Sequence, residues 1–429
     1  MNRVMKGAII PLLACLIMVG VSCCPPAAAN EITIGVIGPM AYVQGEHHWY
    51  GAQLAAEEIN AEGGVLVGGE SYQIKLVKVD SNEILSVTDA ASAMEKAITR
   101  DKVDFLVGGF RTEAVFAMQD VAMDYEKIFL GCGASADELC TKVADNYDRY
   151  KYWFRITPVN STNLGQVDFM LIAMVAEKIR AELGIEVPKV AILAEKAVWA
   201  DPIVEAASLY LPALGMEIVG EWRPSATASE VTAELSAIEN AGVHIIFTSI
   251  SGPVGIPYAT QWGELEITAA SVGINVEAQK EGFWDATGGK GNYELTMNTY
   301  ARVNITDETI PFVERFVERA GEFPTYNAGT YEALYILTAA IERAGTLDSD
   351  AVVAELEKTD ATGTAGRMVF TEDHDVTWGP DYVTGLGVQW QDGEMKCVWP
   401  PPGGAWEGVD YEGAVDYILP PWVVEEWGP

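Results

Sequence analysis

The stretch ITIGVIGPMAYVQGEHHWYGAQLAAEEINAEGGV, from Ile32 to Val65, contains the elements that decide the fold of this chain. It opens with an apolar, strand-like run, turns at a Gly-Pro pair and passes through an aromatic-rich loop into an amphipathic helix. This order predicts one βα unit. In an open α/β sheet a ligand binds beyond the carboxyl ends of the strands. Tyr42 and Gln44 in the loop are therefore predicted to shape a ligand pocket.

The residues before this unit have the features of a secretory leader. A basic start, an apolar core from Gly7 to Val21 and three alanines at 27–29 predict a signal peptide over residues 1–29. Cys23 and Cys24 follow the apolar core and resemble the acylated cysteine of a lipoprotein. We therefore expect an exported protein, in the periplasm or at the cell surface, with lipid anchoring through Cys23 or Cys24 left open.

Composition limits the class of protein and its partners. The chain has 429 residues, more than one ordinary core accommodates, so two lobes or domains are expected. Its hydrophobic content of 49% excludes a disordered chain. Its 62 acidic and 27 basic residues give a formal net charge of -35, which repels nucleic acid, so no nucleic-acid partner is expected. The charge suggests a high-salt setting, and an ordinary acidic secreted protein is the alternative.

The sequence offers little support for an enzyme or a metal site. It has no HExxH, GxSxG or Walker motif and no complete dinucleotide fingerprint, so neither catalysis nor a cofactor is expected. The adjacent His47 and His48 favour a surface or ligand-edge role over metal binding. After the leader the cysteines are Cys132, Cys140 and Cys397, and a Cys132–Cys140 disulfide and buried free thiols both remain open.

The hydrophobic period alternates between strands and helices along the rest of the chain, and the pattern restarts at residues 154–157. This alternation predicts two α/β units in tandem, each with a parallel sheet between helices. Strands are expected at 74–79, 103–108, 128–131, 189–194, 217–222 and 244–249, and helices at 87–99, 114–125, 164–183, 202–214, 228–241, 311–320, 326–344 and 350–358. A hairpin turning at Asp392-Gly393 follows.

Several segments together resemble one family. IGVIGPM, VDFLVGG, FLGCGASADEL, FRITP, VAILAEKAVW, VHIIFTS, YNAGTYEALYILTAAIERAGT and GVQWQDGEMKCVWPP, in this order between residues 31 and 400, resemble the leucine/isoleucine/valine type of ABC-transporter substrate-binding protein. The resemblance implies a type I periplasmic binding protein fold, in which two doubly wound parallel-sheet lobes joined by three hinge crossings close on a small ligand. It also implies a monomer that meets a membrane permease.

The resemblance places the lobes along the chain. Residues 31–157 and 300–370 are expected to form the N-terminal lobe, and residues 158–299 and 378–398 the C-terminal lobe. The Pro- and Trp-rich tail at 400–429 is expected to pack on a lobe as an extended strap.

Two loops of the first lobe align with ligand-holding loops of the family. Thr112 and Ser135 keep the hydroxyls there and lie at or near helix starts, where free N–H groups favour an anion. A simple N-cap is the alternative role for both. Gly133 would let the backbone approach the ligand, or only turn the chain. Arg111 would neutralise a second carboxylate of the ligand or pair with Glu113.

Three positions carry over from the second lobe. Trp199 falls where the family uses an aromatic residue to cover the ligand, with lobe packing as the alternative, and Ser251 matches another contact. Asn275, in a loop predicted at residues 273–275, stands where amino-acid binders commonly carry an acid for the ligand's ammonium. Glu277 and Glu113 could substitute for that acid.

The resemblance thus implies the binding component of an ABC importer for a branched-chain or related amino acid. Binding of amides or short-chain carboxylates is one alternative. A ligand-sensing protein that serves a receptor partner is another.

Overall fold

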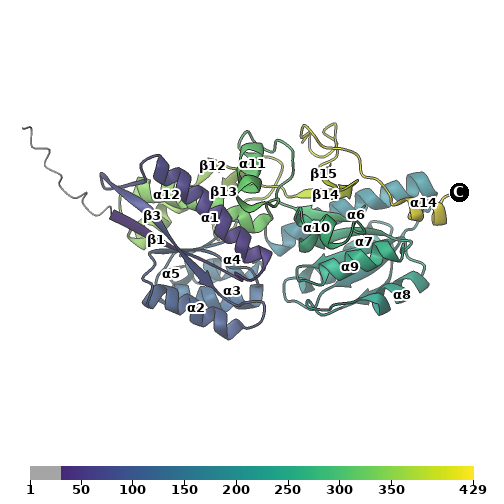
Figure 1. Cartoon of the computed structure of the whole chain (residues 1–429), viewed down its shortest axis with the longest axis horizontal. Helices are drawn as coiled ribbons and strands as arrows, with labels where there is room; N and C mark the ends of the chain where they lie inside the picture. Colours follow the sequence, from purple (N-terminus) through teal and green to yellow (C-terminus); the bar gives the residue numbers. More distant parts are fainter. Residues whose placement is uncertain (1–29) are drawn as a thin grey trace, which may run out of the picture.

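The computed structural model describes residues 30–429, so the predicted signal peptide and its cysteines lie outside the described residues. The chain forms two α/β lobes that lie side by side (Figure 1). Among residues 30–429, no helix combines the length and the apolar character that a membrane crossing requires.

The sheet of the first lobe has six strands in the order β2-β3-β1-β4-β5-β6. All its pairings are parallel except that of β2 with β3. Helices α1, α11 and α12 contact one another on one side of the lobe, and α2 and α3 pack together on the other (Figure 1). The strands are β1 (Asn30–Gly38), β2 (Val65–Val67), β3 (Glu70–Asp80), β4 (Phe105–Gly108), β5 (Phe129–Gly131) and β6 (Trp153–Arg155), and the helices are α1 (Val43–Ala61), α2 (Val87–Thr99), α3 (Thr112–Asp124), α4 (Glu138–Asp145), α5 (Tyr147–Tyr150), α11 (Thr309–Ala320), α12 (Thr330–Ala344) and α13 (Ser349–Leu356).

The sheet of the second lobe has seven strands in the order β15-β14-β11-β10-β9-β7-β8. Its centre is parallel, and the hairpin of β14 and β15 adds an antiparallel edge. The strands are β7 (Lys189–Ala194), β8 (Glu217–Trp222), β9 (Ile245–Ile250), β10 (Ala270–Asn275), β11 (Leu295–Asn298), β14 (Leu386–Gln391) and β15 (Glu394–Trp399), and the helices are α6 (Ser161–Leu183), α7 (Asp201–Ala213), α8 (Thr232–Asn240), α9 (Gly255–Glu264) and α10 (Phe283–Ala286).

The chain passes between the two sheets three times, through residues 156–160, 299–308 and 370–385. The prediction of two mostly parallel α/β lobes joined by three crossings is therefore confirmed. The expected hairpin turn is also present, because Asp392 and Gly393 have φ of 53° and 86° and link β14 to β15.

Two central strands were missed by the sequence analysis. The loop predicted at residues 273–275 is the end of β10, and no strand was predicted at β11. Both strands are short and buried along their whole length, so they lack the alternation of polar and apolar residues that marks a half-exposed strand.

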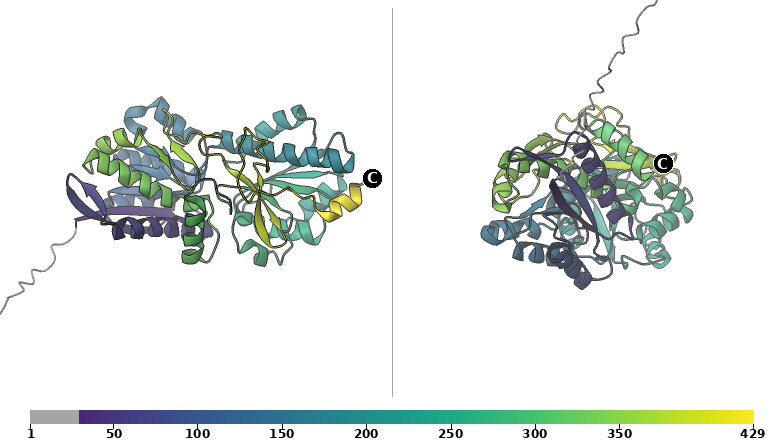
Figure 2. Two further views of the ribbon diagram at one scale, coloured as in Figure 1. Left: turned by 90° about the horizontal axis from the view of Figure 1, so that it is seen from above. Right: turned by 60° about the vertical axis from the view of Figure 1, so that its left-hand side comes forward.

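The C-terminal segment runs along the second lobe and ends in α14 (Pro421–Trp427), as the yellow chain in Figure 2 shows. Trp422 Nε1 donates to the carbonyl oxygen of Ile267 at 2.9 Å, and Trp427 Nε1 donates to that of Thr268 at 2.6 Å. The indole rings thus cover apolar surface of the lobe and satisfy buried carbonyl groups.

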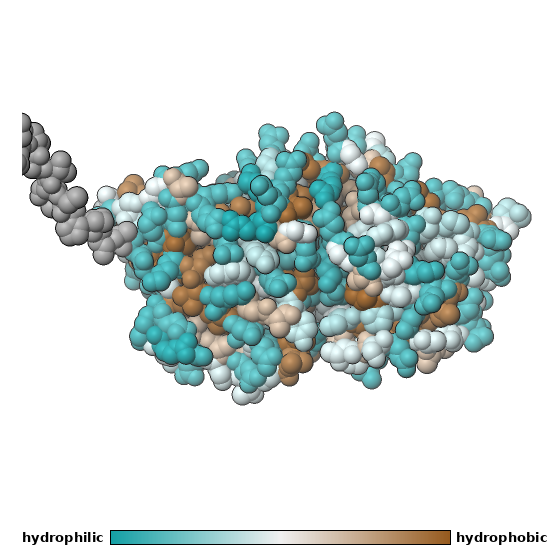
Figure 3. Space-filling model, viewed as in Figure 1, coloured by the Kyte–Doolittle hydropathy of each residue, from teal (hydrophilic) through white to brown (hydrophobic). Residues whose placement is uncertain are grey.

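The face of the molecule in Figure 3 is largely polar.

Candidate functional site

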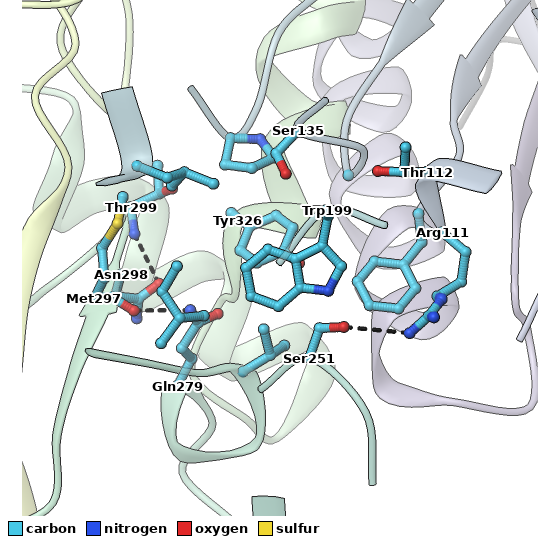
Figure 4. A pocket seen from close by; sticks show the side chains of 16 residues that line it. Arg111, Thr112, Ser135, Trp199, Ser251, Gln279, Met297, Asn298, Thr299 and Tyr326 are labelled. Atoms are coloured by element: carbon cyan, nitrogen blue, oxygen red, sulfur yellow. Dashed lines mark hydrogen bonds between the residues drawn. The ribbon is translucent and has the colours of Figure 1, made fainter. Parts of the chain in front are cut away.

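A small cavity lies between the lobes, at the carboxyl ends of strands from both sheets (Figure 4). The centres of water-sized spheres can occupy about 40 Å³ of it. With the water radius added, a compact solute of roughly 180 Å³ would fill that space, which is the size of one amino acid and not of a peptide. Its lining residues are Phe110, Arg111, Thr112, Gly133, Ser135, Pro158, Leu164, Trp199, Ser251, Ile274, Val276, Gln279, Met297, Asn298, Thr299 and Tyr326.

The loop after β4 lines the cavity with Phe110 and Arg111 and leads into α3 at Thr112. The buried carboxylate of Glu83 accepts the N–H groups of Phe110 and Arg111 at 2.9 and 2.8 Å. Burial raises the pKa of Glu83 to about 7, and these hydrogen bonds oppose the increase. Among the described residues, no acceptor binds the next two N–H groups, those of Thr112 and Glu113 at the start of α3. They are available to an anion, beside the hydroxyl of Thr112.

The loop after β5 approaches the first loop closely because residue 133 is glycine. A Cβ atom on Gly133 would lie 2.2 Å from the carbonyl oxygen of Gly109 and 2.8 Å from Cα of Phe110. Gly133 is therefore required by the contact between the two loops. Ser135 follows it, and its hydroxyl lies 3.3 Å from that of Ser161 at the start of α6 and faces the cavity (Figure 4).

An ion pair joins the lobes at one end of the cavity. Nη1 of Arg111, from the first lobe, lies 3.1 Å from Oε1 of Glu195, which follows β7 in the second lobe and is fully buried. Nη2 of Arg111 is 3.5 Å from Glu113. Of the two roles expected for Arg111, pairing with a protein carboxylate is the one observed, and Glu195 was not anticipated as its partner. The lobes are thus in contact across the cavity.

Trp199 and Ser251 complete this end of the cavity from the second lobe. Trp199 is only 7% exposed although it lies in the turn before α7, and its indole faces the centre of the cavity (Figure 4). Its Nε1 donates to Oε1 of Glu195 at 3.0 Å, and Ser251 Oγ donates to the same oxygen at 2.5 Å. Glu195 therefore positions the tryptophan, the serine and the arginine together.

Comparison with known proteins identifies the family. The family model described as periplasmic binding protein matches residues 31–386. This chain belongs to that family.

Relatives and solved structures agree with this membership. The Leu/Ile/Val-binding protein homolog 7 of Brucella abortus is 23% identical over 397 residues, which are 87% of this chain and 92% of that protein. The structure of LivJ, a branched-chain amino acid transporter substrate-binding protein of Streptococcus pneumoniae in complex with isoleucine, superimposes with a TM-score of 0.71 at 20% identity, covering 85% of this chain and 98% of that one. A solute-binding protein of R. palustris in complex with benzoate gives a TM-score of 0.69 at 19% identity, covering 90% and 99%.

Six of the nine predicted contact residues of this periplasmic binding protein line the cavity, and Tyr42, Gln44 and Asn275 do not. Tyr42 is the half-buried N-cap residue of α1, and Gln44 is buried within the first turn of that helix. The amide of Asn275 is fully buried behind the cavity wall and donates to Gly255 and Glu294, both at 3.2 Å. None of the three lines this cavity, and their role as ligand contacts stays a prediction.

The surface role expected for the two histidines is also wrong. His47 and His48 are 1% and 0% exposed, and burial lowers their pKa to about 3 and about 4, so both are neutral. His47 accepts the N–H of Thr325 at 3.1 Å, and His48 lies 3.1 Å from the carbonyl oxygen of Cys132. His47 ties α1 to the segment before α12, and His48 ties it to the loop after β5. Among the described residues, no group of three or more His, Cys, Asp and Glu side chains is arranged to hold a metal.

The three cysteines of the described chain are buried free thiols, so a Cys132–Cys140 disulfide is absent there. Burial raises the pKa of Cys132 and Cys140, which keeps both thiols protonated and poorly nucleophilic.

Tyr326, Gln279 and Asn298 line the cavity but were not predicted as contacts. Tyr326 begins the quoted segment YNAGTYEAL and could have been found from its place at a helix start. Gln279 and Asn298 had no usable signal, because the strands that lead to them, β10 and β11, went unrecognised.

Proposed function

We propose that this periplasmic binding protein is the extracytoplasmic component of an ABC importer, and that it closes on one small organic solute bearing a carboxylate. The observation that carries the proposal is the cavity of single-amino-acid size between the lobes, with free N–H groups and hydroxyls on its first-lobe side. The protein performs no chemistry on the solute.

The acidic end of the ligand would bind to the first lobe. The N–H groups at the start of α3 and the hydroxyls of Thr112 and Ser135 supply hydrogen-bond donors for a carboxylate, as helix N-termini do for anions. The apolar side chains of Leu164, Ile274 and Met297 would then contact the body of the ligand from the second lobe.

Closure would be the functional step. The ligand adds contacts with Trp199 and the second lobe only when the lobes meet, so it shifts the population toward the closed form. The Arg111–Glu195 ion pair favours the same form without ligand. A membrane permease that recognises the closed form would complete the system.

The lining also bears on the ligand class. The names of relatives such as the Leu/Ile/Val-binding protein homologue make amino acids the first class to test. Among the described lining residues, however, none is Asp or Glu to neutralise an ammonium group. This favours the second class, carboxylates and amides without an amino group.

A thermal-shift screen of residues 30–429 against amino acids, amides and small carboxylates tests the proposal, at low and high salt. A ligand at 100 times its dissociation constant stabilises by about 2.7 kcal/mol, which shifts the midpoint visibly. Thr112→Ala should reduce that shift and leave the unliganded midpoint unchanged. A screen without any stabilising solute would contradict the proposed function.

A further inference from the structure

Two polar side chains at the second-lobe end of the cavity each have one atom without a partner. Gln279 and Asn298 line the cavity and are only 2% and 0% exposed. Among the described residues, Gln279 Oε1 and Asn298 Nδ2 have no hydrogen-bond partner. A buried polar atom without a partner is costly, so two of them in one cavity wall indicate that something else supplies their partners.

The neighbouring backbone determines which amide atoms are free. Gln279 Nε2 donates to the carbonyl oxygen of Met297 at 2.8 Å, and Asn298 Oδ1 accepts the N–H of Thr299 at 2.8 Å. Rotating the Gln279 amide by half a turn would place its oxygen against the carbonyl oxygen of Met297, which are two acceptors. Rotating the Asn298 amide would place its NH₂ group against the N–H of Thr299, which are two donors. The free atoms are therefore an acceptor on Gln279 and a donor on Asn298. Both side chains lie close to Met297 at the same end of the cavity (Figure 4).

We propose that this end of the cavity binds a carboxamide group of the ligand. The amide N–H of the ligand would donate to Gln279 Oε1, and its carbonyl would accept from Asn298 Nδ2. This inference rests on the proposed function and narrows its substrate class to small carboxylates that carry a primary amide at the far end, in place of amino acids.

An ammonium group would find no countercharge at this site. The buried carboxylate of Glu195, which contacts the lining residues Arg111, Trp199 and Ser251, is fully used. Its Oε1 accepts from Arg111, Trp199 and Ser251 Oγ, and its Oε2 accepts the N–H groups of Ser251 and Gly252 at 3.0 and 2.7 Å. A carboxylate has about four acceptor sites, so none remains for a ligand.

The acids that could have substituted for Asn275 are also engaged or displaced. Glu277 pairs with Lys280 at 2.7 Å, and Glu113 accepts the N–H of Val198 at 3.2 Å across the lobes. Neither lines the cavity. Burial of an unpaired ammonium there would be strongly unfavourable, whereas a neutral amide satisfies both free atoms.

Isothermal titration of residues 30–429 with four matched probes tests the inference. Glutaramate, glutarate, 5-aminopentanoate and pentanoate share a five-carbon carboxylate and differ only at the far end, which is an amide, a carboxylate, an ammonium or a methyl group. Glutaramate should bind at least roughly tenfold more tightly than the other three. Pentanoate leaves both protein atoms unsatisfied, glutarate cannot donate to Gln279 Oε1, and 5-aminopentanoate cannot accept from Asn298 Nδ2.

A charge-introducing variant should reverse this preference. In Asn298→Asp one carboxylate oxygen still accepts from Thr299, and the other replaces the free donor. 5-Aminopentanoate should then bind more tightly than glutaramate. Asn240→Asp, at an exposed residue of α8, adds the same charge away from the cavity and should leave the wild-type order unchanged. Asn298→Leu should weaken glutaramate binding, because the carbonyl of the ligand loses its donor while Gln279 Oε1 remains. This variant covers the case in which the Asp variant does not fold.

The outcomes separate this inference from the proposed function. Tightest binding of 5-aminopentanoate by the wild-type protein would overturn the amide site while leaving the importer role intact. Equal affinity for glutaramate and pentanoate would overturn it too, since water would then satisfy the two atoms. If the protein binds other screened solutes but none of these probes, the amide site is also overturned. If it binds no solute at all, the proposed function itself is refuted.

Discussion

Glu83 offers a quantitative test of how the first-lobe loop is held. Its carboxylate is 3% exposed and accepts three hydrogen bonds, from the N–H groups of Phe110 and Arg111 and from Ser81 Oγ at 2.8 Å. Glu83→Gln can keep all three, because the amide oxygen accepts both N–H groups and the amide nitrogen donates to the serine hydroxyl. The substitution therefore removes the buried charge and little else.

The magnitude follows from the pKa of Glu83, which burial raises from 4.5 to about 7. Between these values the folded protein holds a proton that the unfolded chain has lost, so the free energy of unfolding falls as pH rises from 4.5 to above 7. A shift of this size corresponds to about 3 kcal/mol. Glu83→Gln should be more stable than the wild type by about that amount at pH 8, and the difference should vanish near pH 4.5.

Urea unfolding followed by circular dichroism at pH 5, 6, 7 and 8, at constant ionic strength, measures the difference. Burial also raises the pKa of Glu294 to about 7, but this residue is unchanged in both proteins and cancels. Glu205→Gln, on the exposed side of α7, is the matched control and should follow the wild type. Parallel pH curves for the wild type and Glu83→Gln would refute the reasoning, as would a loss of stability of the variant at pH 8.

Three further outcomes are expected. Trp199→Ala should weaken ligand binding at least roughly tenfold, measured by titration calorimetry, because the indole closes the cavity; unchanged affinity would mean that it serves lobe packing alone. Arg111→Met should leave Glu195 buried without its cation and destabilise the closed form by about 3 kcal/mol. Solution scattering should then show a larger radius of gyration, and an unchanged radius would mean that the ion pair does not hold the lobes closed. Raising sodium chloride from low concentration to about 1 M should raise the unfolding midpoint, because salt screens the repulsion within a chain of net charge -35; an unchanged midpoint would remove the basis for a high-salt setting.

The candidate site was predicted best where a loop follows a recognisable strand. Arg111, Thr112, Gly133 and Ser135 follow β4 and β5, whose apolar runs were clear, and all four line the cavity. Prediction failed where the strand itself was not apparent. Asn275 was placed in a loop, but it ends the buried strand β10 and its amide faces the protein interior.

The sequence by itself determined the alternation of strands and helices, and with it two mostly parallel sheets with loops at their carboxyl ends, because hydrophobic periodicity is a local property of the chain. The tertiary structure alone decided which polar groups those loops leave free. Glu195 meets Arg111 across the lobes, 84 residues away in the chain, and Gln279 and Asn298 are oriented by backbone atoms of neighbouring segments. Such pairings depend on which side chains the folded lobes bring within hydrogen-bond distance, and no local pattern encodes that.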